Sequence, residues 1–232
     1  MSLGVASFLA LALAISIGAV VPAAAHHVGV FIPRDDDVTK NFKEIKFAVE
    51  AGRFELALRL FDDGVVHATM EKEEKRLPRG LEDGVRAALR AKDRPGVELR
   101  LAVFLTFMTR DRLAFALERL RRADLPPGRR REQVRRVLDA AWRYYNLADF
   151  AVGSRDAQAS AALRLDFEDA YTYLGSAMVD PMWAGAASTR ASRVDEAKAT
   201  AAVGRLIETS GRFIAHGGAP GRTGTGTRPP PR

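Results

Sequence analysis

The chain has 232 residues, 47% of them hydrophobic, with no cysteine and a formal net charge of +7. The lack of cysteine excludes disulfides, thiolate catalysis and cysteine–metal centres. A basic chain can indicate nucleic acid, but much of the excess charge lies in or beside the C-terminal tail, and many other arginines stand beside acidic residues. We therefore predict no nucleic-acid partner.

The N-terminus has the features of an export leader. Residues 3–21 are uncharged and almost wholly apolar, Pro22 follows, and Ala23-Ala24-Ala25 supplies the small residues that a signal peptidase requires. This pattern predicts a signal peptide over residues 1–25 and a periplasmic location. The apolar stretch is also long enough to span a bilayer, so an uncleaved N-terminal anchor is the alternative, and only that form would hold the protein on a membrane.

The rest of the chain is predicted to be helical. Residues 26–38 form an extended segment, with Asp37 or Thr39 as the cap of the first helix. Apolar residues at helical spacing, bounded by glycine and proline, then predict helices over residues 39–52, 54–75, 81–91, 97–123, 131–152, 156–178 and 193–214. Residues 215–232 are predicted to be a disordered basic tail of Gly, Pro and Thr. The fold class is therefore all-α, an antiparallel helical bundle or array of about seven helices in one domain over residues 39–214.

One short pattern is typical of paired helices. Gly52-x-Phe54-x-x-Ala57-x-x-x-Phe61 matches the second half of a tetratricopeptide unit, and no second copy follows at that period. A single helical hairpin explains it.

A first candidate metal site lies on the second predicted helix. His67, Glu71 and Glu74 occupy positions i, i+4 and i+7, so their side chains would share one face. An imidazole and two carboxylates can bind iron, manganese or zinc. The alternative is an exposed run of ion pairs, because all six residues from 71 to 76 are charged.

A second set of polar residues lies on predicted core faces. Tyr145 and Asp149 fall on the apolar stripe of the fifth helix, and Asp156 and Asp166 share a face of the sixth with small and apolar residues. Ionised carboxylates at such positions are costly unless they are paired or bind a metal. The alternative partners are the arginines Arg143, Arg155 and Arg164.

His26 and His27 form a third candidate. If the leader is cleaved after Ala25, the new α-amine and the two imidazoles could chelate Cu²⁺ or Ni²⁺. Beyond these candidates the chain holds no nucleophile elbow, phosphate-binding glycine loop or His-Glu-x-x-His motif, and we predict that it is not an enzyme.

Part of the chain resembles a known family. The matching residues are Ala48-Val49-Glu50-Ala51-Gly52-Arg53-Phe54, Ala57-Leu58, the stretch from His67 to Glu74, Leu77-Pro78 and Leu81-Glu82. They resemble the helical extracytoplasmic domains associated with bacterial high-affinity iron-uptake permeases. The resemblance implies iron as the bound metal, a membrane iron-uptake component or another periplasmic protein as partner, and a role in iron handling for His67, Glu71 and Glu74. The Arg-Glu-x-x-Glu motif of the permease core is absent.

These observations lead to two hypotheses. In the first, the protein is a periplasmic, non-enzymatic helical protein that binds iron and delivers it to an uptake system. The cluster of His67, Glu71 and Glu74 is then faced by a second set on neighbouring helices, Asp149, Tyr145, Asp156 and Asp166. In the second, it is a non-catalytic helical scaffold of tetratricopeptide-like hairpins that binds a protein partner through its Arg-rich faces, and the buried acids are structural ion pairs.

Overall fold

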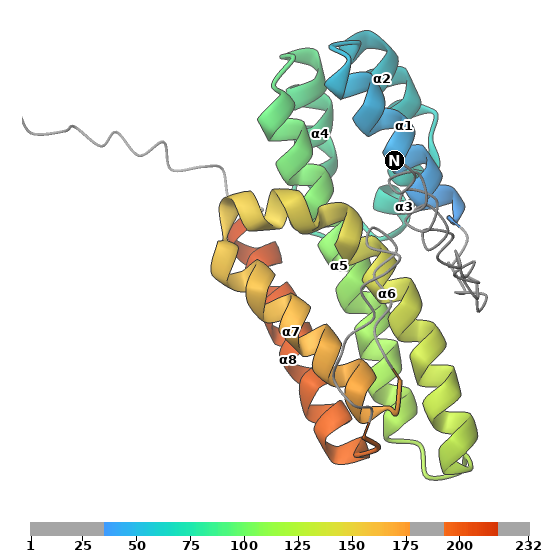
Figure 1. Cartoon of the computed structure of the whole chain (residues 1–232). Helices are drawn as coiled ribbons and strands as arrows, with labels where there is room; N and C mark the ends of the chain where they lie inside the picture. The colour runs from blue at the N-terminus through green and yellow to red at the C-terminus, as the bar shows by residue number, and fades with distance from the viewer. Residues whose placement is uncertain (1–34, 177–192, 218–232) are drawn as a thin grey trace, which may run out of the picture. The chain divides into compact units, whose positions relative to one another are not determined.

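Among residues 35–176 and 193–217, which the computed structural model describes, the backbone forms eight α-helices and no strand (Figure 1). The helices are α1 (Asp37–Glu50), α2 (Phe54–Asp62), α3 (Val65–Lys72), α4 (Leu81–Arg90), α5 (Arg94–Leu120), α6 (Pro127–Arg155), α7 (Ala157–Tyr173) and α8 (Glu196–Gly217). The predicted all-α class is confirmed. The leader and the pair His26-His27 lie outside the described residues.

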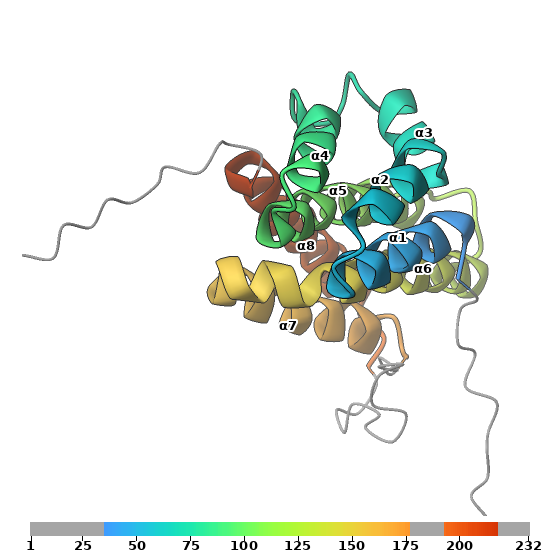
Figure 2. The ribbon, with the colours of Figure 1, turned by 90° about the horizontal axis from the view of Figure 1, so that it is seen from above.

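The helices form two packed groups that share one apolar core. The long helices α5 and α6 pack against each other, α8 packs along α5, and α7 packs along α8 and α6 (Figures 1 and 2). In the second group α1 and α2 form a hairpin, and α4 packs against both α2 and α5. The buried apolar side chains of both groups belong to one continuous cluster. No helix among the described residues is long and apolar enough to cross a membrane.

The predicted apolar stripe of α6 is confirmed. Val134, Leu138, Ala141, Trp142, Tyr145 and Ala148 are all buried. The rings of Trp142 and Tyr145 pack with that of Phe167 from α7, with centroids 5.1–5.6 Å apart. This aromatic group joins α6 to α7 in the core.

Most helix bounds differ from the predictions by a few residues: α5 begins and ends three residues earlier, α6 begins at Pro127 and ends at Arg155, α7 ends at Tyr173 and α8 begins at Glu196. Three differences have a structural reason. The cap of α1 is Asp36, whose carboxylate accepts a hydrogen bond from the backbone N–H of Thr39 at 2.9 Å, so the helix begins at Asp37, inside the segment predicted to be extended. The predicted helix over residues 54–75 is two helices, α2 and α3, which differ in direction. At the other end, α8 runs three residues past 214, because Gly217 is buried against the side chain of Val103.

Candidate metal centre

The break between α2 and α3 is fixed by one side chain of α1. The amide of Asn41 donates to the carbonyl of Leu60 at 2.9 Å, and its oxygen accepts from the N–H of Val66 at 3.0 Å. Asn41 therefore satisfies backbone groups on both sides of the turn. Only glycine fits at position 64, since a Cβ there would overlap both the Leu60 carbonyl and the Asn41 amide. The chain thus turns at Gly64, and α3 presents a different face from the one that a continuous helix would present.

The turn places His67 in the first part of α3 with a defined ring orientation. Its Nδ1 lies 2.9 Å from the backbone carbonyl oxygen of Asp62. Because a carbonyl only accepts, we assign the proton to Nδ1, which leaves Nε2 as the atom that faces the other polar groups. The ring also packs on the buried ring of Phe61, with centroids 5.4 Å apart, and the side chain is only 13% exposed. A fixed Nδ1–H and a directed Nε2 are typical of metal-ligating histidines.

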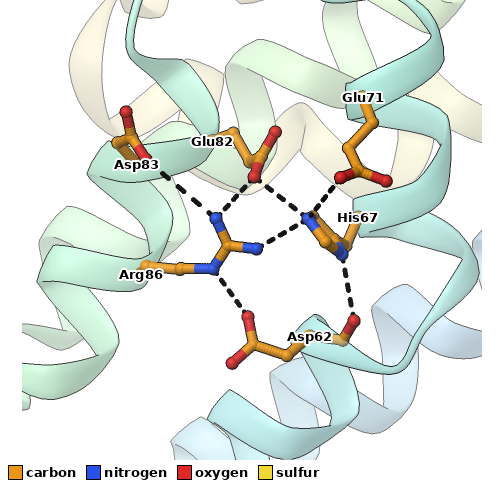
Figure 3. Close-up of polar contacts among 6 residues, drawn as sticks. All are labelled: Asp62, His67, Glu71, Glu82, Asp83 and Arg86. Atoms are coloured by element: carbon orange, nitrogen blue, oxygen red, sulfur yellow. Dashed lines mark hydrogen bonds and ion pairs between the residues drawn. The ribbon is translucent and has the colours of Figure 1, made fainter.

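Two carboxylates approach Nε2 from different helices (Figure 3). Glu71, one turn further along α3, places Oε1 3.6 Å from Nε2, and Glu82, in the first turn of α4, places Oε1 3.0 Å from it. The three potential ligand atoms all lie within 4.8 Å of one another. Glu71 is 62% exposed and Glu82 25%, so the group is open to solvent on one side.

The guanidinium of Arg86, from α4, lies inside this group. Its Nη2 donates to His67 Nε2 at 2.6 Å, its Nη1 to Glu82 at 2.5 Å and its Nε to Asp62 at 2.7 Å. The hydrogen bond with Asp62, followed by that with Glu82, raises the pKa of Arg86 above its ordinary value, although burial opposes this. Asp83 stands 4.0 Å from Nη1. Arg86 thus acts as the resident cation of the cluster.

The neutral ring satisfies the polar contacts of Nε2. With the proton on Nδ1, Nε2 accepts from Arg86 Nη2 and Glu82 Oε1 accepts from Arg86 Nη1, so one guanidinium bridges two acceptors that lie 3.0 Å apart. A metal ion bound by Nε2 and Oε1 would take the place that this guanidinium holds. Of the six residues drawn in Figure 3, four are carboxylates (Asp62, Glu71, Glu82 and Asp83) and one is a guanidinium, Arg86. Glu71 and Asp83 are 62% and 88% exposed to water, and Lys75 and Arg79 line a hollow together with Glu82 and Asp83.

Glu74 does not join this cluster. The helix α3 ends at Lys72. Glu74 therefore lies in the following turn, where it is exposed, and does not continue the helix face of His67 and Glu71. The prediction that His67, Glu71 and Glu74 share one helix face is therefore wrong for Glu74. Glu82 takes that place, and the sequence spacing had not identified it.

Tyr145 and Asp149 lie in a separate polar cluster between α6 and α7. The Tyr145 hydroxyl donates to Asp149 at 2.5 Å, the Ser160 hydroxyl donates at 2.9 Å, and Arg164 forms an ion pair with the same carboxylate. Burial opposes ionisation of Asp149, but the hydrogen bonds from Arg164, Tyr145 and Ser160 outweigh it and lower its pKa. Burial, and then the bond to Asp149, raises the pKa of Tyr145. The carboxylate is fully partnered by the protein itself.

Asp156 and Asp166 also have structural partners. Asp156 is exposed and caps α7, accepting from the N–H of Ala159 at 2.9 Å, so its predicted place among apolar neighbours is wrong. Asp166 is buried and pairs with Arg205 of α8 at 2.7 Å. The ion-pair interpretation is confirmed for Asp149 and Asp166. Arg164, the partner of Asp149, is one of the predicted arginines, whereas Arg205, the partner of Asp166, is not. Neither aspartate is part of the group around His67.

Comparison with known proteins gave no match to a family model, a curated protein or a solved structure.

Proposed function

We propose that this protein binds a first-row transition-metal ion, iron foremost, through His67 Nε2 and the carboxylates of Glu71 and Glu82, and that it does so without catalysis. The observation that carries the proposal is the convergence of these three atoms around a ring whose Nδ1 is anchored to a backbone carbonyl. The hydrogen bond from Nδ1 to the Asp62 carbonyl orients Nε2 before an ion arrives.

The two separations from Nε2 are close to those of ligands on one metal ion, and the two carboxylate oxygens lie within 4.8 Å of each other. Ligand atoms bound about 2.1 Å from a tetrahedral or octahedral ion stand about 3.0–3.5 Å apart, and Nε2 lies 3.0 and 3.6 Å from the two carboxylate oxygens. One imidazole and two carboxylates suit iron, manganese and zinc. Three protein ligands leave further positions of the ion for water or for a ligand from a partner. A site of this kind favours exchange of the ion over permanent retention.

Binding requires that Arg86 leaves its place between Nε2 and Glu82. The guanidinium can keep its bond to Asp62 and turn toward Asp83, which already stands 4.0 Å away. The ion therefore replaces one cation with another. Because this exchange opposes binding, we expect an affinity in the micromolar range rather than that of a closed structural site.

The sequence supplies the wider setting of the proposal. The predicted leader supports an exported, periplasmic protein, and the resemblance to domains associated with iron-uptake permeases supports delivery of the ion to a membrane iron-uptake component. Both remain predictions that the metal titration below does not depend on.

Titration calorimetry under anaerobic conditions tests the metal site. The protein is titrated with Fe²⁺, and then with Mn²⁺ and Zn²⁺. We expect micromolar binding of at least one ion and a loss of at least about tenfold in Glu82→Gln and in His67→Ala. Glu74→Gln is the matched control, because it removes the same charge from an exposed position outside the cluster. No micromolar binding, or an equal loss in Glu74→Gln, would refute the proposal.

The alternative function, a scaffold for a protein partner, is favoured by one observation. Phe150 is 79% exposed beside a small apolar cavity between α1, α5 and α6. The charged residues at the rim pair with each other, Lys46 with Glu50 at 3.7 Å and Arg94 with Glu98 at 2.7 Å. The surface is thus apolar and locally neutral, which suits an apolar side chain of a partner.

A further inference from the structure

Besides the C-terminal tail, positive charge gathers at one turn of the helical domain. Residues 119–136 contain eight arginines and two acidic residues, a net charge of +6, whereas the whole chain carries +7. The segment comprises the last residues of α5, the connecting turn and the first ten residues of α6, and it lies at the bottom of Figure 1. We call it the basic tip.

Arg121, Arg129 and Arg135 are exposed and form no ion pair within 4.0 Å in the described part of the chain. Arg135 lies near Asp139, since its charge opposes the rise that burial causes in the pKa of that carboxyl. The others have partners: Arg122 with Asp124, Arg130 and Arg131 with Glu196, Arg136 with Glu132, and Arg119 with the ring of Phe115. Unpaired guanidinium groups leave their fork of donors available to phosphate oxygens.

Apolar side chains lie beside and within the basic tip: Phe115 is one helical turn before it on α5, and Leu125 lies inside it. Phe115 is 41% exposed, and the guanidinium carbon of Arg119 lies 4.6 Å from its ring centroid. Leu125 lies in the turn with Pro126 and Pro127, and both prolines are exposed. The turn combines guanidinium groups with apolar side chains. A membrane interface offers a partner to each, because lipid phosphates lie at its surface and acyl chains lie beneath them.

We propose that the basic tip binds the surface of an anionic phospholipid membrane. The arginines contact the lipid phosphates, while the apolar residues of the turn enter the headgroup region. A nucleic acid would also attract the arginines, but it has no apolar phase that the exposed apolar residues could enter. The α2–α4 metal cluster carries the opposite charge, and the 27 residues of α5 span about 40 Å. The inference does not depend on metal binding.

Vesicle co-sedimentation of the full chain tests this inference. The vesicles are phosphatidylcholine alone, or phosphatidylcholine with about a third of phosphatidylglycerol, in about 0.1 M salt. Each arginine near an anionic surface contributes about fivefold to binding, so Arg121→Gln/Arg129→Gln/Arg135→Gln should bind anionic vesicles about 100-fold more weakly. The neutral vesicles measure any contribution of the apolar residues 3–21.

A matched control separates this surface from total charge. Arg53→Gln/Arg79→Gln/Arg90→Gln removes the same charge from exposed arginines that form no ion pair in the described residues. Support for the proposal is binding that requires anionic lipid, is lost in the tip variant and stays within about threefold in the control. An equal loss in both variants, equal binding to neutral vesicles, or tighter binding to a short DNA duplex at the same salt overturns it.

Discussion

Asn41 gives the sharpest test of how the fold builds the site. Replacing it with alanine removes the acceptor of the buried Val66 N–H and the donor to the Leu60 carbonyl. A buried N–H left without a partner costs about 1–3 kcal/mol, and the second hydrogen bond contributes about 1 kcal/mol. We therefore expect Asn41→Ala to lower the free energy of unfolding by about 2–4 kcal/mol. In a domain of this size the loss lowers Tm by about 5–15 °C.

Urea and thermal denaturation followed by circular dichroism measure this change. Thr69→Ala is the control, because its hydroxyl makes only a local bond to Val65 within α3, and we expect a change below about 0.5 kcal/mol. The same loosened turn should weaken metal binding, since His67 then has to be ordered by the ion itself. A stability loss in Asn41→Ala no larger than that of Thr69→Ala would refute the view that this side chain holds the α2–α3 turn.

Three further predictions concern the turn, the resident cation and the second polar cluster. Gly64→Ala should lower stability by about 2–4 kcal/mol in thermal denaturation, because the new Cβ overlaps backbone and the Asn41 amide; a variant as stable as the wild type would contradict this packing. Arg86→Gln should raise metal affinity about tenfold in calorimetry, because the competing charge is gone; a weaker affinity would show that Arg86 orders the ligands and does not compete with the ion. Asp149→Asn should cost about 1–2 kcal/mol near pH 7 in urea denaturation. Folding lowers the pKa of Asp149, so the ionised carboxylate stabilises the fold above the unfolded pKa of about 3.9, and this stabilisation is lost as pH falls through the folded pKa. The free energies of unfolding of the wild type and of Asp149→Asn should therefore converge in acid. A difference that persists there would contradict the assignment.

The helical architecture follows largely from local pattern. The stripe on α6 from Val134 to Ala148 is buried as its spacing predicts, because a long amphipathic helix has one face that must leave water. The break at Gly64 is different. Nothing in the period of residues 54–75 marks it, since the turn depends on Asn41, which lies more than 20 residues earlier in the chain. Tertiary hydrogen bonds of this kind override a continuous helical pattern.

The candidate site was predictable only in part, for the same reason. His67 and Glu71 share a helix and are found by their spacing of four residues. Glu82 comes from the next helix, and only the packing of α4 beside α3 brings it to Nε2. Glu82 and Arg86 are themselves an i, i+4 pair, and this is the one local signal that could have directed attention to α4.

The balance of charge distinguishes the two acidic regions that the sequence identified. Around Asp149 and Asp166 each carboxylate meets a guanidinium from another part of the chain, so these acids are compensated and stabilise the packing of α6, α7 and α8. Around His67, Glu71 and Glu82 both approach the same ring nitrogen, and one guanidinium, that of Arg86, stands between them and Asp62. Glu82 is 25% exposed, so water screens its repulsion with Glu71 less than it would in open solvent. An added cation would reduce that repulsion, whereas the carboxylate of Asp149 is already paired with Arg164. The proposed metal binding therefore belongs to the α2–α4 group, and the paired carboxylates of Asp149 and Asp166 are structural.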